Sequence, residues 1–174
     1  MDFLELAKAR YSVRKFSSEP VRKVDLNLIL KAGHLAPTAC NKQPQHIIVI
    51  DTTEGLSQLK KCTTSHFNCS LAFLVCYDTT QCWVREFDGK NSGEVDASIV
   101  ATHMMLEAAS IGVGSTWVMH FIPEAIVEEF SLPPHIIPVA ILVMGYPALD
   151  AHPSSLHHKF RDEKELIHFY NPLK

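Results

Sequence analysis

VDASIVATHMMLEAASI, at residues 95–111, is the stretch of this sequence that decides the fold. At helical spacing it presents one largely apolar face: Ile99, Thr102, Met105, Leu106 and Ala109. Further apolar residues cover most of the remaining surface, and the polar stripe is narrow: Asp96, His103, Glu107 and Ser110. A helix that is apolar on nearly all sides is buried on nearly all sides. The stretch therefore predicts a central helix, and in a small domain it points to a subunit interface.

Strands and further helices surround this helix in an irregular order. Four apolar runs predict strands at residues 46–50, 71–77, 115–120 and 138–145. Helices are predicted at residues 54–61, 123–130 and 162–169, and two more begin at the N-cap candidates Asp2 and Asp25. Residues 81–94 are polar, contain two glycines, and predict a loop or lid. Because the regular alternation of a doubly wound sheet is missing, the predicted fold class is α+β.

The bulk properties indicate an ordinary globular protein. A length of 174 residues suits a single domain, residues 1–174. The net charge of -3 gives no support for nucleic-acid binding. The sequence contains no signal-peptide pattern and no apolar run of the ~20 residues that a membrane span needs, so we expect a cytoplasmic protein without a membrane partner. Five cysteines without a CxxC pair fit reduced thiols better than disulfides.

Two segments carry cations that alternate with other residues. Arg10, Ser12 and Arg14 lie at alternating positions just after the first helix, so in an extended segment they point the same way. Guanidinium groups and a hydroxyl make a good phosphate cradle. Lys159 and Arg161 repeat the pattern near the C-terminus. The alternative interpretation for both segments is a solvated basic surface.

A third segment, APTACNKQPQ at residues 36–45, is a proline-bounded loop rich in hydroxyl and carboxamide groups. Such a loop can hydrogen-bond a polar heterocycle or a polyol. The alternative is an ordinary connection from helix to strand, whose polar residues satisfy their own backbone.

These segments resemble, in the right order, the nitroreductase-like FMN-dependent oxidoreductases. The N-terminal Arg-x-Ser-x-Arg-x-Phe, the Ala-Pro-x-x-x-Asn-x-Gln-Pro loop with Thr38 in place of the usual serine, and the Lys-x-Arg tail all match. So do a helix that begins with Asp-Ala and ends in Gly-x-Gly-Ser-x-Trp, and a later Gly-Tyr-Pro. The resemblance covers nearly the whole chain. It implies a nitroreductase-like fold with a central mixed or antiparallel sheet, flanked by helices, in an intertwined homodimer.

The resemblance also implies which residues bind FMN. The phosphate and ribityl chain would be held by Arg10, Ser12, Lys159 and Arg161. Arg14 matches a basic position near the pyrimidine edge of the flavin, and is the candidate stabiliser of the reduced flavin. Residues from the other subunit would line the ring and ribityl side: Pro37, Thr38, Ala39, Asn41 and Gln43. Backbone would run past the ring at Ser115, Thr116 and Trp117.

The implied activity is hydride transfer from NAD(P)H through the bound flavin to a small acceptor, such as a nitroaromatic or a quinone, by a ping-pong mechanism. The cofactor carries the chemistry, so no catalytic side chain is expected. The alternative is an FMN-binding redox sensor or flavin store with little NAD(P)H turnover. The sequence leaves three questions open: the acceptor, the choice between NADH and NADPH, and the role of residues 81–94 with Trp83, Arg85 and Phe87.

Cys62, His66 and Cys69 are the one group in the sequence that resembles a metal site. Their spacing fits no common zinc site, so scattered thiols are the better interpretation and no metal is predicted.

Overall fold

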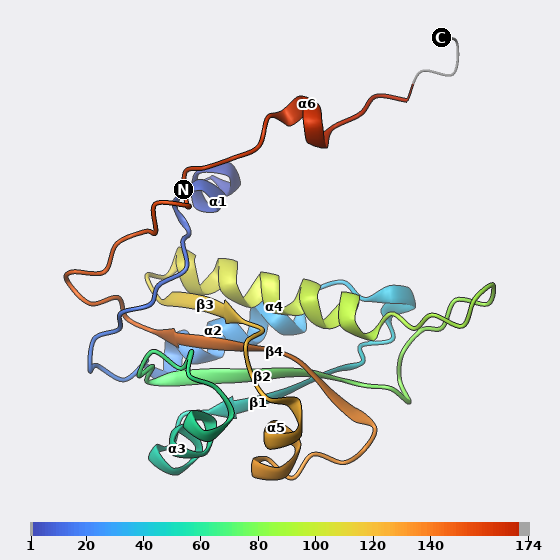
Figure 1. Cartoon of the computed structure of the whole chain (residues 1–174), viewed down its shortest axis with the longest axis horizontal. Helices are drawn as coiled ribbons and strands as arrows, with labels where there is room; N and C mark the ends of the chain where they lie inside the picture. The colour runs from blue at the N-terminus through green and yellow to red at the C-terminus, as the bar shows by residue number, and fades with distance from the viewer. Residues whose placement is uncertain (1, 171–174) are drawn as a thin grey trace.

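A four-stranded antiparallel sheet forms the centre of the computed structural model, which describes residues 2–170 (Figure 1). Its order is β1-β2-β4-β3, from β1 (Gln45–Ile50), β2 (Leu71–Asp78), β4 (Ile136–Gly145) and β3 (Gly114–Val118). All four strands were predicted from the sequence, with bounds that differ by a few residues. Pro138 lies inside β4, and the register between β2 and β4 shifts opposite it, between Val75 and Cys76. A proline has no N–H to donate to the ladder, so an irregularity is expected there.

Helices cover both faces of this sheet (Figure 1). One face carries α2 (Lys23–His34) and α4 (Gly93–Ser110), and the other carries α3 (Thr53–Cys62) and α5 (Pro123–Glu129). β2 shows why both faces are covered: Phe73 packs into the cluster under α4, and Leu74 into the cluster with α3 and α5. A strand that is apolar at successive positions must be buried on both sides. The predicted α+β class is therefore confirmed.

Within a single chain, α4 buries the face that packs on the sheet and leaves the opposite face partly exposed. Its side chains toward the sheet are fully buried: Ala97, Val100, Ala101, Met104 and Ala108. On the opposite face Val95 is 55% exposed, and Ile99 and Leu106 are half-buried. The predicted burial on nearly all sides is thus not met by one copy of the chain. That face lines a groove of 610 Å³, together with Phe3 of α1 (Phe3–Ala9).

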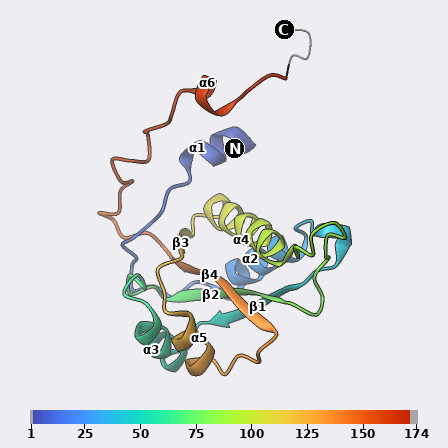
Figure 2. The same ribbon diagram turned by 45° about the vertical axis from the view of Figure 1, so that its right-hand side comes forward.

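α1 and the C-terminal arm lie on the same side of the molecule, away from the sheet (Figures 1 and 2). α1 begins as predicted, in a capping box: the Asp2 carboxylate accepts a hydrogen bond from the Glu5 backbone, and the Glu5 carboxylate accepts one from the Asp2 backbone. The C-terminal arm, residues 151–170, contains α6 (Glu163–Leu166). The prediction of a helix over residues 162–169 was too long, because every residue from 162 to 170 is exposed and no packing extends the single turn.

Two other predictions also need correction. Asp25 is not the N-cap of α2, which begins at Lys23: its carboxylate instead accepts hydrogen bonds from Arg22 Nε (2.8 Å) and Tyr146 Oη (2.5 Å). The predicted loop or lid is partly ordered as a hairpin, residues 83–92, closed by a bridge between Val84 and Asn91. Its last two predicted residues already belong to α4. Over residues 2–170, no helix combines the length and the apolar character that spanning a membrane requires.

Candidate functional site

The N-terminal motif, residues 10–16, docks along β3 as a partial fifth strand. Ser12 forms a parallel bridge with Ser115, and the Val13 backbone donates to the Ser115 carbonyl at 3.0 Å. The Thr116 hydroxyl donates to the Val13 carbonyl at 2.6 Å. Because Val13 is buried, the alternation along an extended segment turns its neighbours Ser12 and Arg14 to the other side. Ser12 and Arg14 therefore share a side, as the sequence predicted, and line one pocket with Lys15, whereas Arg10 lines a different cavity together with Val13.

A close approach of backbone to side chain makes this docking possible. A Cβ atom at Gly114 would lie 2.7 Å from Val13 Cγ2, so only glycine lets the motif pack this closely on β3. The motif and the start of β3 also line a cavity of 130 Å³, to which Arg10, Tyr11 and Ser115 contribute. Ser115 Oγ is buried and has no hydrogen-bond partner among the described residues.

Cations without acidic partners gather at this end of the molecule. Among residues 2–170, Arg10, Arg14 and Lys159 form no ion pair, whereas Lys15 pairs with Asp150. The Arg14 guanidinium reaches only the Ser12 carbonyl, at 3.4 Å. Unpaired guanidinium and ammonium groups beside an unpartnered hydroxyl fit a phosphate and a polyol chain. The residues present thus fit the phosphate end of FMN.

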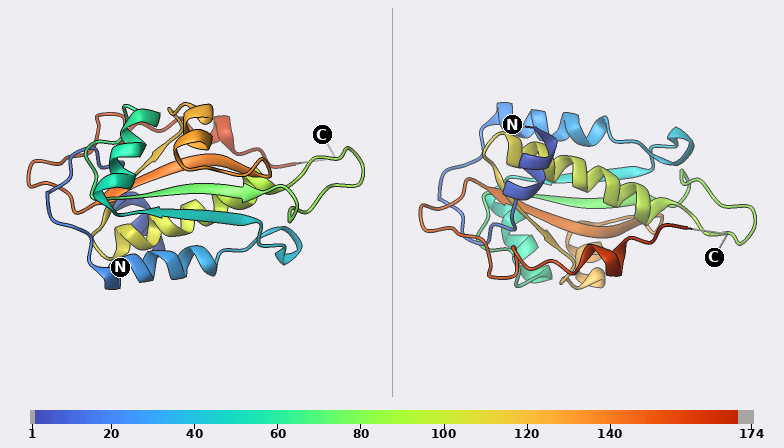
Figure 3. Two further views of the ribbon diagram at one scale, coloured as in Figure 1. Left: turned by 90° about the horizontal axis from the view of Figure 1, so that it is seen from below. Right: turned by 90° about the horizontal axis from the view of Figure 1, so that it is seen from above.

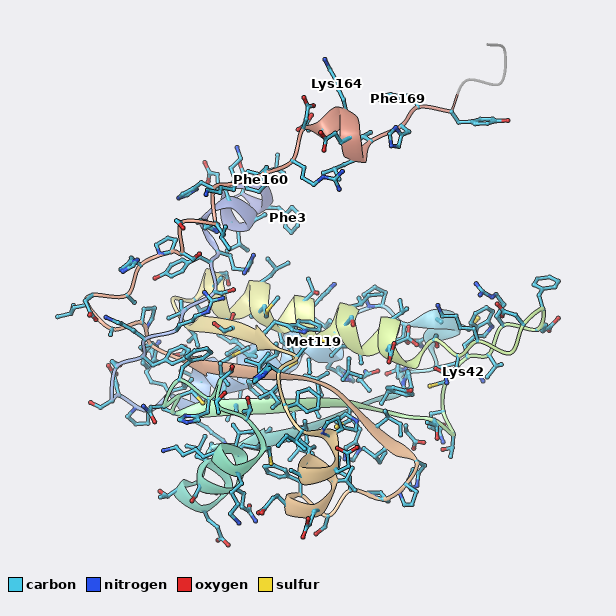
Figure 4. The ribbon with its side chains drawn as sticks, viewed as in Figure 1. Phe3, Lys42, Met119, Phe160, Lys164 and Phe169 are labelled. Atoms are coloured by element: carbon cyan, nitrogen blue, oxygen red, sulfur yellow. The ribbon has the colours of Figure 1, made fainter. Side chains whose placement is uncertain are left out.

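The C-terminal arm runs past the same end. His157 Nε2 lies 3.1 Å from the Lys8 carbonyl, and the ring centroids of His157 and Tyr11 are 6.2 Å apart. Figure 4 shows Phe160 beside α1 and Phe3. The part of the arm that carries Lys159 therefore passes close to the end of α1, which the N-terminal motif follows. Arg161 lies further along the arm, where it is exposed and pairs with Glu165 at 3.1 Å.

The 36–45 loop is tightly wound and presents polar side chains to solvent. Cys40, Asn41 and Gln43 all have positive φ, between 48° and 51°. Thr38 holds the turn from inside, because its carbonyl accepts from the Asn41 backbone and its hydroxyl from the Gln43 backbone, both at 3.0 Å. The side chains of Asn41 and Gln43 are exposed, so they are free to bind a ligand outside the loop.

Asp96 anchors this loop to α4, and the sequence analysis gave it no role. It is 1% exposed, and its Oδ1 accepts a hydrogen bond from the Ala39 backbone at 2.8 Å. The first turn of α4 carries two acidic residues, Glu94 and Asp96, and nothing in the sequence marks Asp96 as the anchor.

The loop and the N-terminal motif lie at opposite ends of α4 (Figure 3). The loop contacts the first turns at Asp96, and the motif shares its cavity with Ala109 and Gly112 at the far end. The 18 residues of α4 span about 27 Å at 1.5 Å per residue. Within one chain, the 36–45 loop and the N-terminal motif are therefore separated by the length of α4.

The third group of predicted residues lies mostly in the core. The side chains of Ser115 and Thr116 are 3% and 4% exposed, and Trp117 is half-buried against the cluster under α4. Of the three, Ser115 lines the cavity beside the N-terminal motif.

No group of three metal-binding side chains occurs within the part of the chain that the structure describes. Cys62 and Cys69 are buried separately in the core under α3 and α5. Burial raises the pKa of Cys69 to about 11, and it lowers the pKa of His66 below its ordinary value. Thiols that stay protonated are poor metal ligands.

The sequence matches the model of the Nitroreductase family over residues 7–72 and 70–146, and the chain therefore belongs to that family. It is 31% identical, over 85% of this chain and 78% of the relative, to a protein of Methanothermobacter thermautotrophicus named "Putative NADH dehydrogenase/NAD(P)H nitroreductase".

Solved structures agree with this family. A nitroreductase family protein from Clostridium difficile 630 has 41% identity and a TM-score of 0.93, covering 98% of this chain and 99% of that one. An FMN-dependent nitroreductase from Clostridium difficile R20291 has 27% identity and a TM-score of 0.78, covering 97% and 99%. The family and the nitroreductase-like fold predicted from the sequence are both confirmed.

Proposed function

We propose that this chain, as one domain over residues 1–174, is an FMN-dependent NAD(P)H oxidoreductase that works as a homodimer with two shared sites. Each site combines the N-terminal motif of one copy with the 36–45 loop of the other. A small acceptor, such as a nitroaromatic or a quinone, receives the electrons in a ping-pong cycle. FMN and the NAD(P)H-dependent activity agree with the names of the relatives above.

The separation of the half-sites carries the proposal. Because the loop and the motif lie at opposite ends of a helix of about 27 Å, they can meet on one FMN only when a second copy supplies the other half. Two copies that pack their α4 helices antiparallel would bring each loop to the partner's motif. The exposed apolar face of α4 and its 610 Å³ groove, lined by Phe3, Val95 and Leu106, offer a surface for that packing.

The C-terminal arm supports the same assembly. It exposes Phe160 (84%), Phe169 (93%) and Tyr170 (91%) and makes few contacts with its own chain. Large aromatic side chains gathered on an exposed segment indicate an interaction surface. A second copy would bury them and would order the part of the arm that carries Lys159 and Arg161.

Each residue has a defined task in this site. Arg10, Ser12, Lys159 and Arg161 hold the phosphate and the ribityl chain, and the orphan hydroxyl of Ser115 lies in the cavity that Arg10 lines. Arg14 supplies a fixed positive charge where the reduced ring carries negative charge, a contribution of ~2–4 kcal/mol in a dry site. Bound FMN supplies the hydride chemistry. The exposed carboxamides of Asn41 and Gln43 hydrogen-bond the ring and exclude water from one side of it.

The first experiment asks whether the purified protein is a yellow dimer. We expect one FMN per chain, rapid anaerobic bleaching by NADH or NADPH, and reoxidation by a quinone or a nitroarene in a separate step. Bound flavin that neither nicotinamide reduces would reject the oxidoreductase and favour a flavin store. A monomer with full FMN occupancy would reject the shared site.

A further inference from the structure

Asp96 is a buried carboxylate that meets only neutral donors. Its Oδ1 accepts from the Ala39 backbone at 2.8 Å, and its Oδ2 accepts from the Ser92 hydroxyl at 2.6 Å. Within residues 2–170 no cation forms an ion pair with it. A buried charge without a counter-ion is unfavourable unless its hydrogen bonds are complete. The nearby N-terminus of α4 offsets part of that cost through the helix dipole.

The hydrogen bond from the Ala39 backbone N–H to Asp96 holds the 36–45 loop, whose backbone is strained. Three of the four residues from 40 to 43, namely Cys40, Asn41 and Gln43, have positive φ, a region that non-glycine residues rarely occupy. Conformations of this kind persist only where their surroundings hold them. Among the hydrogen bonds of the described residues, the one to Asp96 is the only link from residues 38–43 to another element.

The second donor ties the hairpin to the same carboxylate. The Ser92 backbone donates to the Trp83 carbonyl at 2.9 Å and so closes the base of the hairpin. Asp96 therefore joins the start of α4, the hairpin base and the 36–45 loop through two short hydrogen bonds.

We propose that Asp96 is a positioning residue that holds the 36–45 loop, with its Asn41 and Gln43 side chains outward, ready for the FMN of the partner copy. The inference rests on the proposed function. Asp96 itself is buried beneath the loop and acts through Ala39. It determines the fraction of protein whose loop is competent to bind, and a smaller competent fraction weakens the apparent affinity in proportion.

Three variants separate positioning from general destabilisation. Asp96→Ala removes both acceptors, and Asp96→Asn keeps an acceptor for Ala39 and a polar partner for Ser92. Thr63→Val is the control, since it removes another short buried hydrogen bond, from Thr63 Oγ1 to the His120 carbonyl at 2.5 Å, beside the end of α3. FMN affinity is measured by quenching of flavin fluorescence. Hydrogen exchange of the peptide over residues 36–45 is measured on protein without FMN.

We expect Asp96→Ala to raise the FMN Kd by roughly 10-fold to 160-fold, the range for losing a hydrogen bond to a charged acceptor. Exchange over residues 36–45 should accelerate in the same variant. Asp96→Asn should stay within about fivefold of the wild type, and Thr63→Val should change neither readout.

Two results would overturn the inference: unchanged exchange over residues 36–45 in Asp96→Ala, or an Asp96→Asn variant as impaired as Asp96→Ala. Failure of the proposed function gives a different result, because wild-type protein would then take up no FMN. The exchange measurement needs no flavin and tests Asp96 independently.

Discussion

A mixed dimer that pairs an Arg10→Ala chain with an Asn41→Gly chain should contain one FMN site of wild-type affinity. In the shared-site arrangement, the motif of the Asn41→Gly chain meets the loop of the Arg10→Ala chain, and both are intact. The other site combines both substitutions. If each chain built its own site, every site would carry one substitution and none would be intact.

The structure sets the size of the effect. Arg10 has no acidic partner among the described residues, so its removal leaves no carboxylate unpaired. Loss of its charge-assisted contact with the phosphate should cost about 1.5–3 kcal/mol of FMN binding, or roughly 10-fold to 160-fold in Kd. Glycine suits the φ of 51° at Asn41, so Asn41→Gly removes the carboxamide without adding strain. Its loss should cost about 0.5–1.5 kcal/mol.

Coexpression with two different affinity tags and tandem purification yields the mixed dimer, and both parent homodimers serve as controls. Titration with FMN should reveal one tight site and one weak site per mixed dimer. Both parent homodimers should show only weakened sites. A mixed dimer in which no site reaches wild-type affinity would refute the reasoning that α4 separates two half-sites.

Three further substitutions or reactions test other parts of the structure. Gly114→Ala places a methyl group 2.7 Å from Val13 Cγ2, so it should lower the unfolding free energy by about 1–3 kcal/mol and weaken FMN binding. An unchanged melting temperature in calorimetry would contradict the docking of the N-terminal motif on β3. Cys40 is exposed, whereas burial raises the pKa of Cys76 to about 12, so a thiol reagent should label Cys40 first, and FMN should protect it. Labelling of Cys76 before Cys40 in peptide mapping would show that the core is open. The hydrogen-bonded guanidinium beside Asp25 lowers the pKa of that carboxyl, so its stabilising effect is present above the ordinary pKa and is lost as pH falls through the lowered one. Asp25→Asn should therefore have a lower unfolding free energy than the wild type in urea melts at neutral pH. This difference between the two proteins should narrow below about pH 4, and a difference that stays constant would contradict the reasoning.

The sequence predicted most helices and strands because turn and capping residues close to them in the chain mark where they begin and end. The apolar runs of β1 and β2 end at turn residues, and α3 is capped by Thr52, whose hydroxyl accepts from the Gly55 backbone. Asp25 shows where this reasoning fails. An aspartate ahead of an apolar run commonly caps a helix, but here its carboxylate is bound by Arg22 and by Tyr146, which lies 121 residues away in sequence. A partner that distant leaves no signal in the local pattern.

The candidate site shows a similar limit. The spacing of Ser12 and Arg14 sufficed to predict their common direction, because an extended backbone alternates its side chains. Arg10, in contrast, lines a different cavity. The role of Asp96 could not be predicted this way, since it depends on a hydrogen bond to a residue 57 positions away. The separation of the two half-sites also required the length of α4 and the packing of both segments on it.

Assembly and cofactor binding should be coupled in this protein, because each proposed FMN site combines segments of two copies. The outer face of α4, with Val95 55% exposed and Leu106 half-buried, lies between the two half-sites and belongs to neither. A charge placed there, as in Leu106→Glu, should dissociate the dimer and so weaken FMN binding without touching any residue that contacts FMN. Linkage also requires the reverse effect: added FMN should restore the dimer, and the apparent FMN affinity should rise with protein concentration. Light scattering during an FMN titration measures both. A Leu106→Glu monomer that binds FMN as tightly as the wild-type dimer would show that the cofactor needs only one chain.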